Sequence, residues 1–386
     1  MVRSSSWGER LGFMVGLILL GCVHQGTDSE PFGDGAWMPH AEQAAETRYD
    51  SDRPALDGYV PSREPDDRPD VTVYGYWPYW GESLGTLPWD QLTHVALFGV
   101  ELTEDGTLAQ THRWTKHAQD ALQFGGSHDV RIHLTLISFA DDVQASVLTD
   151  PERRARAISE LSALLDAEGG HGLNIDIEGL DNDLKEDFVT FVEECSAAFD
   201  EVVVAMPAID WSGSYDYDAL SNASDGLFIM GYGYHWSGGS PGPIAPLYGG
   251  GVWGERSLSW SVEDYRAYGA TDDKIILGLP LYGRQWGTRG EAVPGSATSE
   301  GSAVTYSAAL PVAQEKGRSW DAQTYTPYTF PSASEQLWYD DAESLEAKMG
   351  YAVDEGLQGF GFWALTYDDG DPDLWGRVDA LTHAGR

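Results

Sequence analysis

The sequence predicts an α/β protein whose strands close into a (β/α)8 TIM barrel, with a small insertion subdomain between strand 7 and strand 8. From residue 71 onward, eight apolar runs bounded by turn residues alternate with amphipathic stretches, which fits a closed barrel better than an open sheet. The gap between the last two runs is rich in Gly, Ser, Thr and Tyr over about 287–338, which predicts the insertion. The eight predicted strands are 71–77, 92–100, 130–139, 172–178, 202–207, 226–232, 274–281 and 357–365. Residues 70–386 therefore form the predicted barrel domain.

Residues 1–21 have the pattern of an export signal. Arg3 and Arg10 precede an apolar run, Leu11 to Leu20, that is too short to span a bilayer. The four residues that end in Cys22 resemble a bacterial lipobox, in which the cysteine is lipidated and becomes the new N-terminus. The alternative is an ordinary signal peptide with an incidental cysteine. We therefore expect an exported protein, either a lipoprotein anchored at Cys22 to the bacterial envelope or cell surface, or a secreted protein.

Residues 23–69 predict an acidic, flexible linker between the anchor and the barrel. Segments such as Asp50–Pro54 and Pro61–Asp67 hold too little apolar area to offset the entropy of ordering them. Short ordered pieces are compatible with this composition, but nothing in it indicates chemistry.

The charge of the chain restricts its partners. Asp and Glu number 62 against 23 Lys and Arg, so the formal net charge is −39. Such a surface repels phosphate backbones, and we expect no nucleic-acid partner. A neutral polymer meets no such repulsion. The sequence does not define an oligomeric state, and a monomer is assumed.

The most informative segment of the chain is His171 to Glu178, which reads as a buried strand that ends in a glutamate. Alternation along a strand points Asn174, Asp176 and Glu178 to one face. A row of polar groups inside a barrel is costly unless its members bond each other or serve a substrate. The alternative is an edge strand with a solvated polar face, but the apolar opposite face argues against it. The pattern indicates a functional strand.

Aromatic residues gather where the predicted strands end, which is where barrel enzymes place their chemistry. The chain has 15 tryptophans. Aromatic faces with a few acids suit sugar rings, whose C–H faces stack on aromatic rings; the alternative for any one of these residues is the hydrophobic core. They are Trp77, Tyr79 and Trp80 after the first strand, Tyr232, Tyr234, His235 and Trp236 after the sixth, Tyr282 and Trp286 after the seventh, and Trp363 in the eighth.

Five motifs in order resemble glycoside hydrolase family 18, the chitinase-like family, over essentially all of 71–386. The segment 171–178 matches the spacing of that family's fourth-strand signature, Asp-Gly-x-Asp-x-Asp-x-Glu. The supporting matches are Val73-Tyr74-Gly75-Tyr76-Trp77, Met230-Gly231-Tyr232, Leu277-Gly278-Leu279-Pro280-Leu281-Tyr282-Gly283-Arg284 and Gly361-Phe362-Trp363-Ala364-Leu365.

The resemblance implies a retaining, substrate-assisted mechanism, which departs from the usual two-carboxylate scheme. Glu178 would be the general acid and then the base. Asp176 would hold the acetamido N–H of an N-acetylglucosamine unit, and Tyr232 would bond the acetamido oxygen. Trp363 would form the floor beneath the sugar, and Tyr76 would support Asn174 or Asp176. The full set of residues implied to bind substrate is Trp363, Asn174, Tyr76, Trp77, Met230, Trp236, Tyr282, Arg284 and Trp286.

Three positions depart from the family pattern. His171 stands where the family usually has an acid at the start of the strand, which we interpret as structural. Asn174 replaces the middle acid and removes one negative charge beside Asp176. Gly233 stands where the sixth-strand motif usually has an acid near the catalytic glutamate, and this change puts chitin cleavage in question more than the fold.

Two classes of function follow from these residues. The first is a glycosidase acting on β-linked N-acetylglucosamine-containing glycans, with chito-oligosaccharides ahead of peptidoglycan fragments and the core of N-glycans third. The alternative is a chitinase-like lectin that binds sugar without cleaving it. Since family members that only bind usually lack the glutamate, Glu178 favours the enzyme.

No cofactor and no metal is expected. The acidic turn 368–373 lacks the ligand spacing of a calcium loop. His112 and His117 do not follow the His-Glu-x-x-His pattern of zinc proteases, and both are interpreted as surface residues.

Overall fold

The computed structural model describes residues 39–46, 69, 71–81 and 83–383. The predicted export signal, Cys22 and most of the predicted linker lie outside the described residues. None of the helices in the described ranges combines the length and the apolar content that crossing a lipid bilayer requires.

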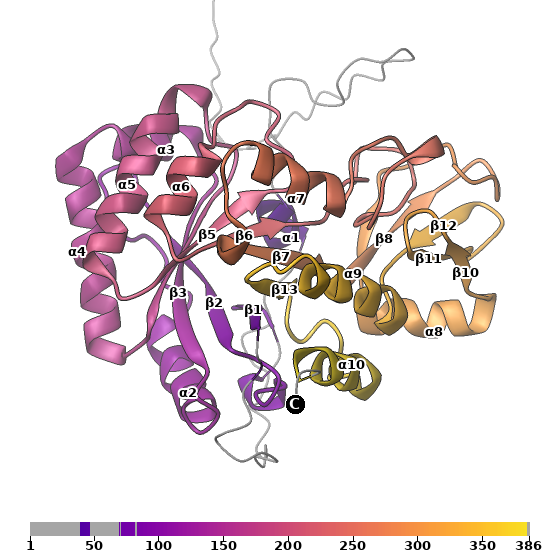
Figure 1. Ribbon diagram of the computed structural model, residues 1–386, viewed down its shortest axis with the longest axis horizontal. Helices are drawn as coiled ribbons and strands as arrows, with labels where there is room; N and C mark the ends of the chain where they lie inside the picture. Colours follow the sequence, from indigo (N-terminus) through magenta and orange to yellow (C-terminus); the bar gives the residue numbers. More distant parts are fainter. Residues whose placement is uncertain (1–38, 47–68, 70, 82, 384–386) are drawn as a thin grey trace, which may run out of the picture. The chain divides into compact units, whose positions relative to one another are not determined.

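Eight parallel strands close into a barrel, which confirms the predicted fold class (Figure 1). The strands follow one another around the barrel in chain order, and the first pairs with the last through Thr72 opposite Gly359. They are β1 (Thr72–Pro78), β2 (His94–Glu101), β3 (Arg131–Ser138), β4 (Gly172–Ile177), β5 (Val202–Pro207), β6 (Gly226–Met230), β7 (Ile275–Pro280) and β13 (Gly359–Trp363).

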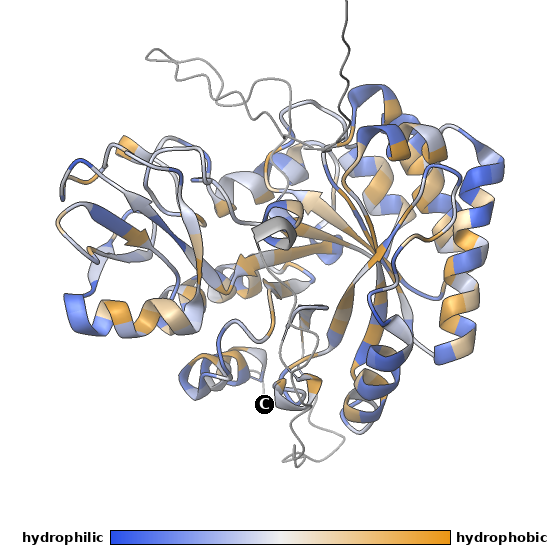
Figure 2. Ribbon diagram, turned by 180° about the vertical axis from the view of Figure 1, so that it is seen from behind, coloured by the Kyte–Doolittle hydropathy of each residue, from blue (hydrophilic) through white to orange (hydrophobic). Residues whose placement is uncertain are grey.

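Helices cover the outside of the barrel, and their polar faces turn away from it (Figure 2). The α-helices of this layer are α2 (Trp114–Gly126), α3 (Asp141–Leu148), α4 (Pro151–Glu168), α5 (Lys185–Ala198), α6 (Tyr217–Ala223), α7 (Leu258–Ala267), α9 (Ala342–Asp354) and α10 (Pro372–Thr382). Short 3-10 turns are η1 (Leu84–Thr86), η2 (Asn182–Leu184), η3 (Gly251–Trp253) and η4 (Asp272–Lys274).

The local sequence sets where these helices begin. Asp150 caps α4 by accepting hydrogen bonds from the N–H groups of Glu152 and Arg153, and Pro151 occupies the first turn, where a missing N–H does no harm. Asp341 and Ser344 form a reciprocal capping box at the start of α9. Both caps satisfy backbone donors that a helix end would otherwise leave unpaired.

The hydrophobic core has two layers, one between barrel and helices and one inside the barrel. Inside, the ring of Phe228 occupies space that two neighbouring strands leave open. A Cβ at Gly278 would lie 2.4 Å from that ring, and a Cβ at Gly361 would lie 2.6 Å from it. Glycine is therefore required at both positions for the barrel to pack at normal density.

The insertion between strand 7 and strand 8 is a five-stranded antiparallel sheet with one helix, at one side of the barrel (Figure 1). Its first strand begins at Tyr282, so the sheet starts earlier than the predicted boundary near residue 287, because the chain enters it directly from β7. The strand order is β10-β11-β12-β8-β9. The elements are β8 (Tyr282–Gly287), β9 (Ser302–Thr305), α8 (Tyr306–Lys316), β10 (Ser319–Asp321), β11 (Thr326–Thr329) and β12 (Glu335–Trp338).

Residues 39–46 of the predicted linker form helix α1 (Pro39–Glu46), a short ordered piece of the kind that the composition allows. Proline at the first helical position and a run of Ala, Glu and Gln are favourable for a helix. A helix of eight residues is nevertheless marginal in water. Contacts with the barrel, described below, stabilise it, and those contacts have no signature in the local sequence.

A buried ion pair connects the insertion to the barrel layer. Lys348 of α9 pairs with Asp340, the second residue after β12, and both side chains are fully buried. Ser344 also donates a hydrogen bond to the same carboxylate, at 2.7 Å. Two buried charges that satisfy each other are tolerated, whereas one left alone is costly.

We predict that Lys348→Ala lowers the free energy of unfolding by about 3–5 kcal/mol, because it leaves Asp340 buried without its counter-ion. Urea denaturation would measure the loss. The matched control is Lys316→Ala, since Lys316 forms an exposed pair with Glu315 and should contribute less than about 1 kcal/mol. Equal effects from the two variants would contradict the prediction.

Candidate active site

The inner face of β4 carries the polar row that the sequence predicts. Asn174, Asp176 and Glu178 are all buried, and they rise along the strand toward the C-terminal mouth of the barrel. The amide of Asn174 donates to the hydroxyl of Tyr76 at 2.9 Å and to the carbonyl of Val203 at 3.3 Å. Asn174 thus lies beneath Asp176 and is linked to the first strand through Tyr76.

The backbone around Glu178 is fixed by neighbours that the sequence did not reveal. Gln144 of α3 donates to the carbonyls of Ser138 and Glu178, at 3.0 and 2.8 Å, and so joins the ends of β3 and β4. The hydroxyl of Tyr215 donates to the carbonyl of Ile177 at 2.9 Å. Neither residue belongs to a motif, because each acts through backbone atoms brought close only by the fold.

Tyr232 and Trp363 complete the site from β6 and β13. Both are buried, and both belong to the aromatic cluster inside the barrel. Burial raises the pKa of the Tyr232 phenol well above its ordinary value, with Tyr76 and Tyr282 adding to the effect. Tyr232 is therefore a neutral hydroxyl that can donate a hydrogen bond. The ring of Trp363 is met edge-on by Phe98, with the ring centroids 4.9 Å apart.

His40 of α1 lies at the centre of these residues. Its Nδ1 is 2.5 Å from Asp176 Oδ2, its Nε2 is 2.6 Å from the Tyr232 hydroxyl, and its backbone N–H donates to Glu178 Oε1 at 3.0 Å. Its ring stacks on Trp363, with centroids 3.7 Å apart and planes 20° apart. No sequence pattern indicates this residue, because it lies far from every site motif in a segment that reads as linker.

Desolvation affects the pKa of the Glu178 carboxyl group. Burial raises its pKa well above the ordinary 4.5, and the negative charge of Asp176 raises it further, while the N–H groups of His40 and Ala41 act in the opposite direction. A carboxyl group that keeps its proton to higher pH can serve as a general acid. Glu178 Oε2 accepts no hydrogen bond from a described residue, which leaves this oxygen available to hold that proton.

One face of β8 supplies the wall on the insertion side. Tyr282, Arg284 and Trp286 alternate onto the same face and are all buried. The ring of Tyr282 lies 6.0 Å from that of Tyr232, and Arg284 forms an ion pair with Glu42 of α1 at 3.0 Å. Trp286 packs in the same aromatic cluster, as does Met230 at the end of β6.

Two further residues of the implied set, Trp77 and Trp236, have other neighbours. Trp77 points to the outer face of β1, where its ring contacts His117 of α2 with centroids 4.6 Å apart. Alternation explains this placement, since Tyr76 takes the inward position. Trp236 is half-buried on the loop after β6, with its ring packed over Gly238 and Gly239.

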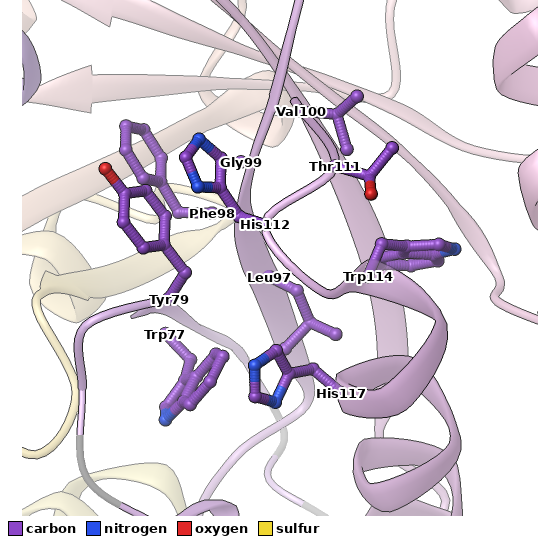
Figure 3. Close-up of a pocket in the computed structure, with 10 residues that line it drawn as sticks. All are labelled: Trp77, Tyr79, Leu97, Phe98, Gly99, Val100, Thr111, His112, Trp114 and His117. Carbon is purple, nitrogen blue, oxygen red and sulfur yellow. The ribbon is translucent and has the colours of Figure 1, made fainter. Parts of the chain in front are cut away.

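A small aromatic pocket lies between β1, β2 and the start of α2 (Figure 3). His112 stacks on Tyr79 with the ring centroids 3.7 Å apart, and its Nε2 donates to Glu101 Oε1 at 2.8 Å. Burial lowers the pKa of His117 to about 4. Both histidines are half-buried beside these rings, so they are more covered than the predicted surface positions. The pocket is lined by Trp77, Tyr79, Leu97, Phe98, Gly99, Val100, Thr111, His112, Trp114 and His117.

Two groups of described side chains bring enough ligand atoms together to be considered for a metal ion. The first, at the N-terminal end of the barrel strands, is His94, His133 and Glu201. There the guanidinium of Arg131 pairs with the Glu201 carboxylate and supplies the positive charge. The second is His40, Asp176 and Glu178, where the imidazole already contacts Asp176 directly. Hydrogen bonds within each group account for both arrangements.

The departures from the family pattern also have structural explanations. His171 accepts a hydrogen bond from the N–H of Ile132 at 2.9 Å, so it joins β4 to β3 at the start of the strands. Gly233 has φ of +78°, a backbone conformation that residues with a Cβ rarely adopt. A residue with a Cβ, such as the acid usual in the family, would be strained in this conformation.

The fold and the polar strand together define a barrel glycosidase, and the comparisons agree. The model of the glycosyl hydrolases family 18 matches residues 72–368. The chain belongs to this family.

Among curated relatives, "Putative sporulation-specific glycosylase YdhD" of Bacillus subtilis is 27% identical over 253 residues, or 61% of this chain. The matched region spans only 56% of that protein. Di-N-acetylchitobiase of Mus musculus is 24% identical over 354 residues, covering 81% of this chain and 88% of that protein. The structure of an Ostrinia furnacalis Group IV chitinase in complex with allosamidin aligns with a TM-score of 0.72 at 20% identity, covering 82% of this chain and all of that one, which shows the shared fold.

The pKa of Glu178 leads to a prediction about stability. Because the folded chain holds this proton more tightly than the unfolded chain, the effect on stability is most favourable below the unfolded pKa, near 4.5, and is lost as the pH rises through the folded pKa. Glu178→Gln removes the free-energy cost of ionising a buried carboxyl group. The oxygen of the new amide can still accept the hydrogen bond from the backbone N–H of His40. We expect the variant to exceed the wild type in free energy of unfolding by about 1 kcal/mol or more at pH 8, with little difference at pH 4.

Thermal denaturation of both proteins across this pH range would measure the difference. Glu343→Gln, at an exposed carboxylate of α9, is the control and should show no such trend. A wild-type-to-variant difference that is the same at pH 4 and pH 8 would contradict the assignment.

Proposed function

We propose that the chain is a glycosidase that cleaves β-linked N-acetylglucosamine-containing glycans by retaining, substrate-assisted catalysis. One observation carries the proposal: the imidazole of His40, stacked on Trp363, contacts Asp176 and Tyr232, while the backbone N–H of His40 donates to Glu178. A sugar in that position would meet an aromatic floor, an acceptor for its acetamido N–H, a donor for its acetamido oxygen and an acid at its glycosidic bond.

The proposed reaction begins with Glu178 as a general acid. Its proton passes to the glycosidic oxygen as the bond to C1 breaks, and the acetamido oxygen attacks C1 to form an oxazolinium ion. Asp176 accepts the acetamido N–H and offsets the positive charge that develops there, and the Tyr232 hydroxyl orients the acetamido oxygen. Glu178, now ionised, removes a proton from water, which attacks C1, opens the oxazolinium ring and retains the configuration. None of these steps uses a metal ion or an organic cofactor.

Two relatives frame the choice of substrate. One is named a chitobiase and the other a sporulation-specific glycosylase, so soluble chito-oligosaccharides and peptidoglycan fragments are the first two candidates, in that order. Products from N-acetylglucosamine oligomers and from purified glycan strands, compared by mass spectrometry, would separate them. The N-glycan core ranks third.

We predict that Glu178→Gln lowers kcat by about a thousandfold or more, since it removes the proton donor assigned to the glycosidic bond. Isothermal titration with tri-N-acetylchitotriose should show that binding survives in this variant. Tyr268→Phe, which alters an exposed hydroxyl at the end of α7, is the control. Binding by the wild type without turnover of any N-acetylglucosaminide would instead identify the chain as a chitinase-like lectin.

We further propose that the protein is exported and anchored to the bacterial envelope through lipidated Cys22, on the evidence of the basic residues, the short apolar run and the lipobox-like sequence. We predict that Cys22→Ser abolishes the incorporation of radiolabelled palmitate in an expressing bacterium, while Cys195→Ser, at a buried core cysteine, leaves it unchanged. Labelling that persists in Cys22→Ser would contradict the anchor.

A further inference from the structure

Helix α1 occupies the place that the proposed mechanism assigns to the sugar. It precedes β1 in the chain, yet it lies at the barrel, and both overall views place it there (Figures 1 and 2). The four side chains to which the mechanism gives a role are Asp176, Glu178, Tyr232 and Trp363. Every one of them contacts His40.

The imidazole reproduces the hydrogen-bonding pattern of an acetamido group. In the tautomer with its proton on Nδ1, the ring donates to the Asp176 carboxylate and accepts from the Tyr232 hydroxyl at Nε2. An acetamido group would donate its N–H and accept at its oxygen to the same two partners. The flat ring on Trp363 takes the place of the apolar face of the sugar.

Two further contacts hold the helix in the mouth. The Oε1 of Gln43 accepts a hydrogen bond from the indole N–H of Trp363 at 2.9 Å. Glu42 pairs with Arg284, which is almost completely buried, whereas the Glu42 side chain is 18% exposed. Ion pairs with a desolvated partner are stronger than pairs at the open surface. The helix is therefore bound through three of its residues, His40, Glu42 and Gln43, that face the barrel.

We propose that α1 is an autoinhibitory segment that competes with the glycan for the catalytic site, with His40 as the group that mimics the acetamido function. The inference rests on the proposed function, because the residues that α1 occupies are those assigned to the sugar. His40 and the sugar cannot hold Asp176 and Tyr232 together. The glycan therefore binds only the fraction of molecules in which α1 has left the mouth.

This competition has a defined kinetic consequence. A competing segment raises the apparent Kd and KM by the inverse of the fraction that is open, but it leaves kcat unchanged. The segment is part of the same chain, so its effective concentration at the site is high and independent of the protein concentration. Removing the side chain of His40 should therefore lower KM rather than raise kcat.

The test uses the full chain and separates binding from turnover. Isothermal titration with tri-N-acetylchitotriose would compare two proteins that both carry Glu178→Gln, one with His40 and one with His40→Ala. We expect the Kd of the His40→Ala protein to be lower by about tenfold or more. In the active background, hydrolysis of a fluorogenic N-acetylglucosamine oligomer should show KM lowered by a similar factor with kcat retained. Glu42→Gln should give a smaller change in the same direction.

Two variants serve as matched controls. His383→Ala removes a histidine at the end of α10, on the outside of the barrel. Glu343→Gln removes a carboxylate that pairs with Arg318 at 2.8 Å on the exposed face of α9, as Glu42 pairs with Arg284. Both should leave Kd and KM at the wild-type values.

The outcomes distinguish this inference from the proposed function. Tighter binding in His40→Ala without hydrolysis by any variant would retain the autoinhibitory helix and overturn the glycosidase. Hydrolysis by the wild type with equal Kd and KM in His40→Ala would overturn the autoinhibitory helix alone. Loss of kcat in His40→Ala would also overturn it, because His40 would then assist the reaction rather than block it.

Discussion

The structure depends on the burial of two carboxyl groups, Asp176 and Glu178, on the inner face of one barrel strand. Neither group has solvent to stabilise a charge, so each requires partners supplied by the surrounding strands. The same burial raises the pKa of Glu178 and makes it fit to carry a proton. Stability and proposed chemistry therefore oppose each other here, as is common at functional sites.

The rest of the barrel holds this pair in place. Tyr76 fixes Asn174 from below, and Gln144 fixes the backbone of Glu178 from the side. The carboxylates are thereby held on a rigid strand and not on a loop, which keeps their positions independent of loop motion. The insertion adds a second wall through β8, so both the barrel sheet and the antiparallel sheet of the insertion border the mouth.

Helix α1 connects this electrostatic arrangement to control of the site. The groups that would bind an acetamido sugar are strong hydrogen-bonding partners in a desolvated space, and leaving them unpaired is costly. A segment of the same chain that offers an imidazole N–H, a flat ring and a carboxylate for Arg284 satisfies them in the absence of sugar. The features that make the site suited to a sugar also make it suited to His40.

The sequence by itself determined the barrel, because the apolar runs and the turn residues between them are local patterns. It also determined the inward row of side chains that ends in Glu178, because alternation along a strand decides which face each side chain points to. It also placed Tyr282 and Arg284 at the mouth. Only the tertiary structure decided that Gln144 and Tyr215 hold the strand ends and that His40 enters the site. These contacts join residues far apart in the chain, such as His40 and Tyr232, which are 192 positions apart, and no local pattern records them. The physical reason is that these residues are far apart in the chain. The closure of the barrel brings them together, and the conformational propensity of a single segment does not.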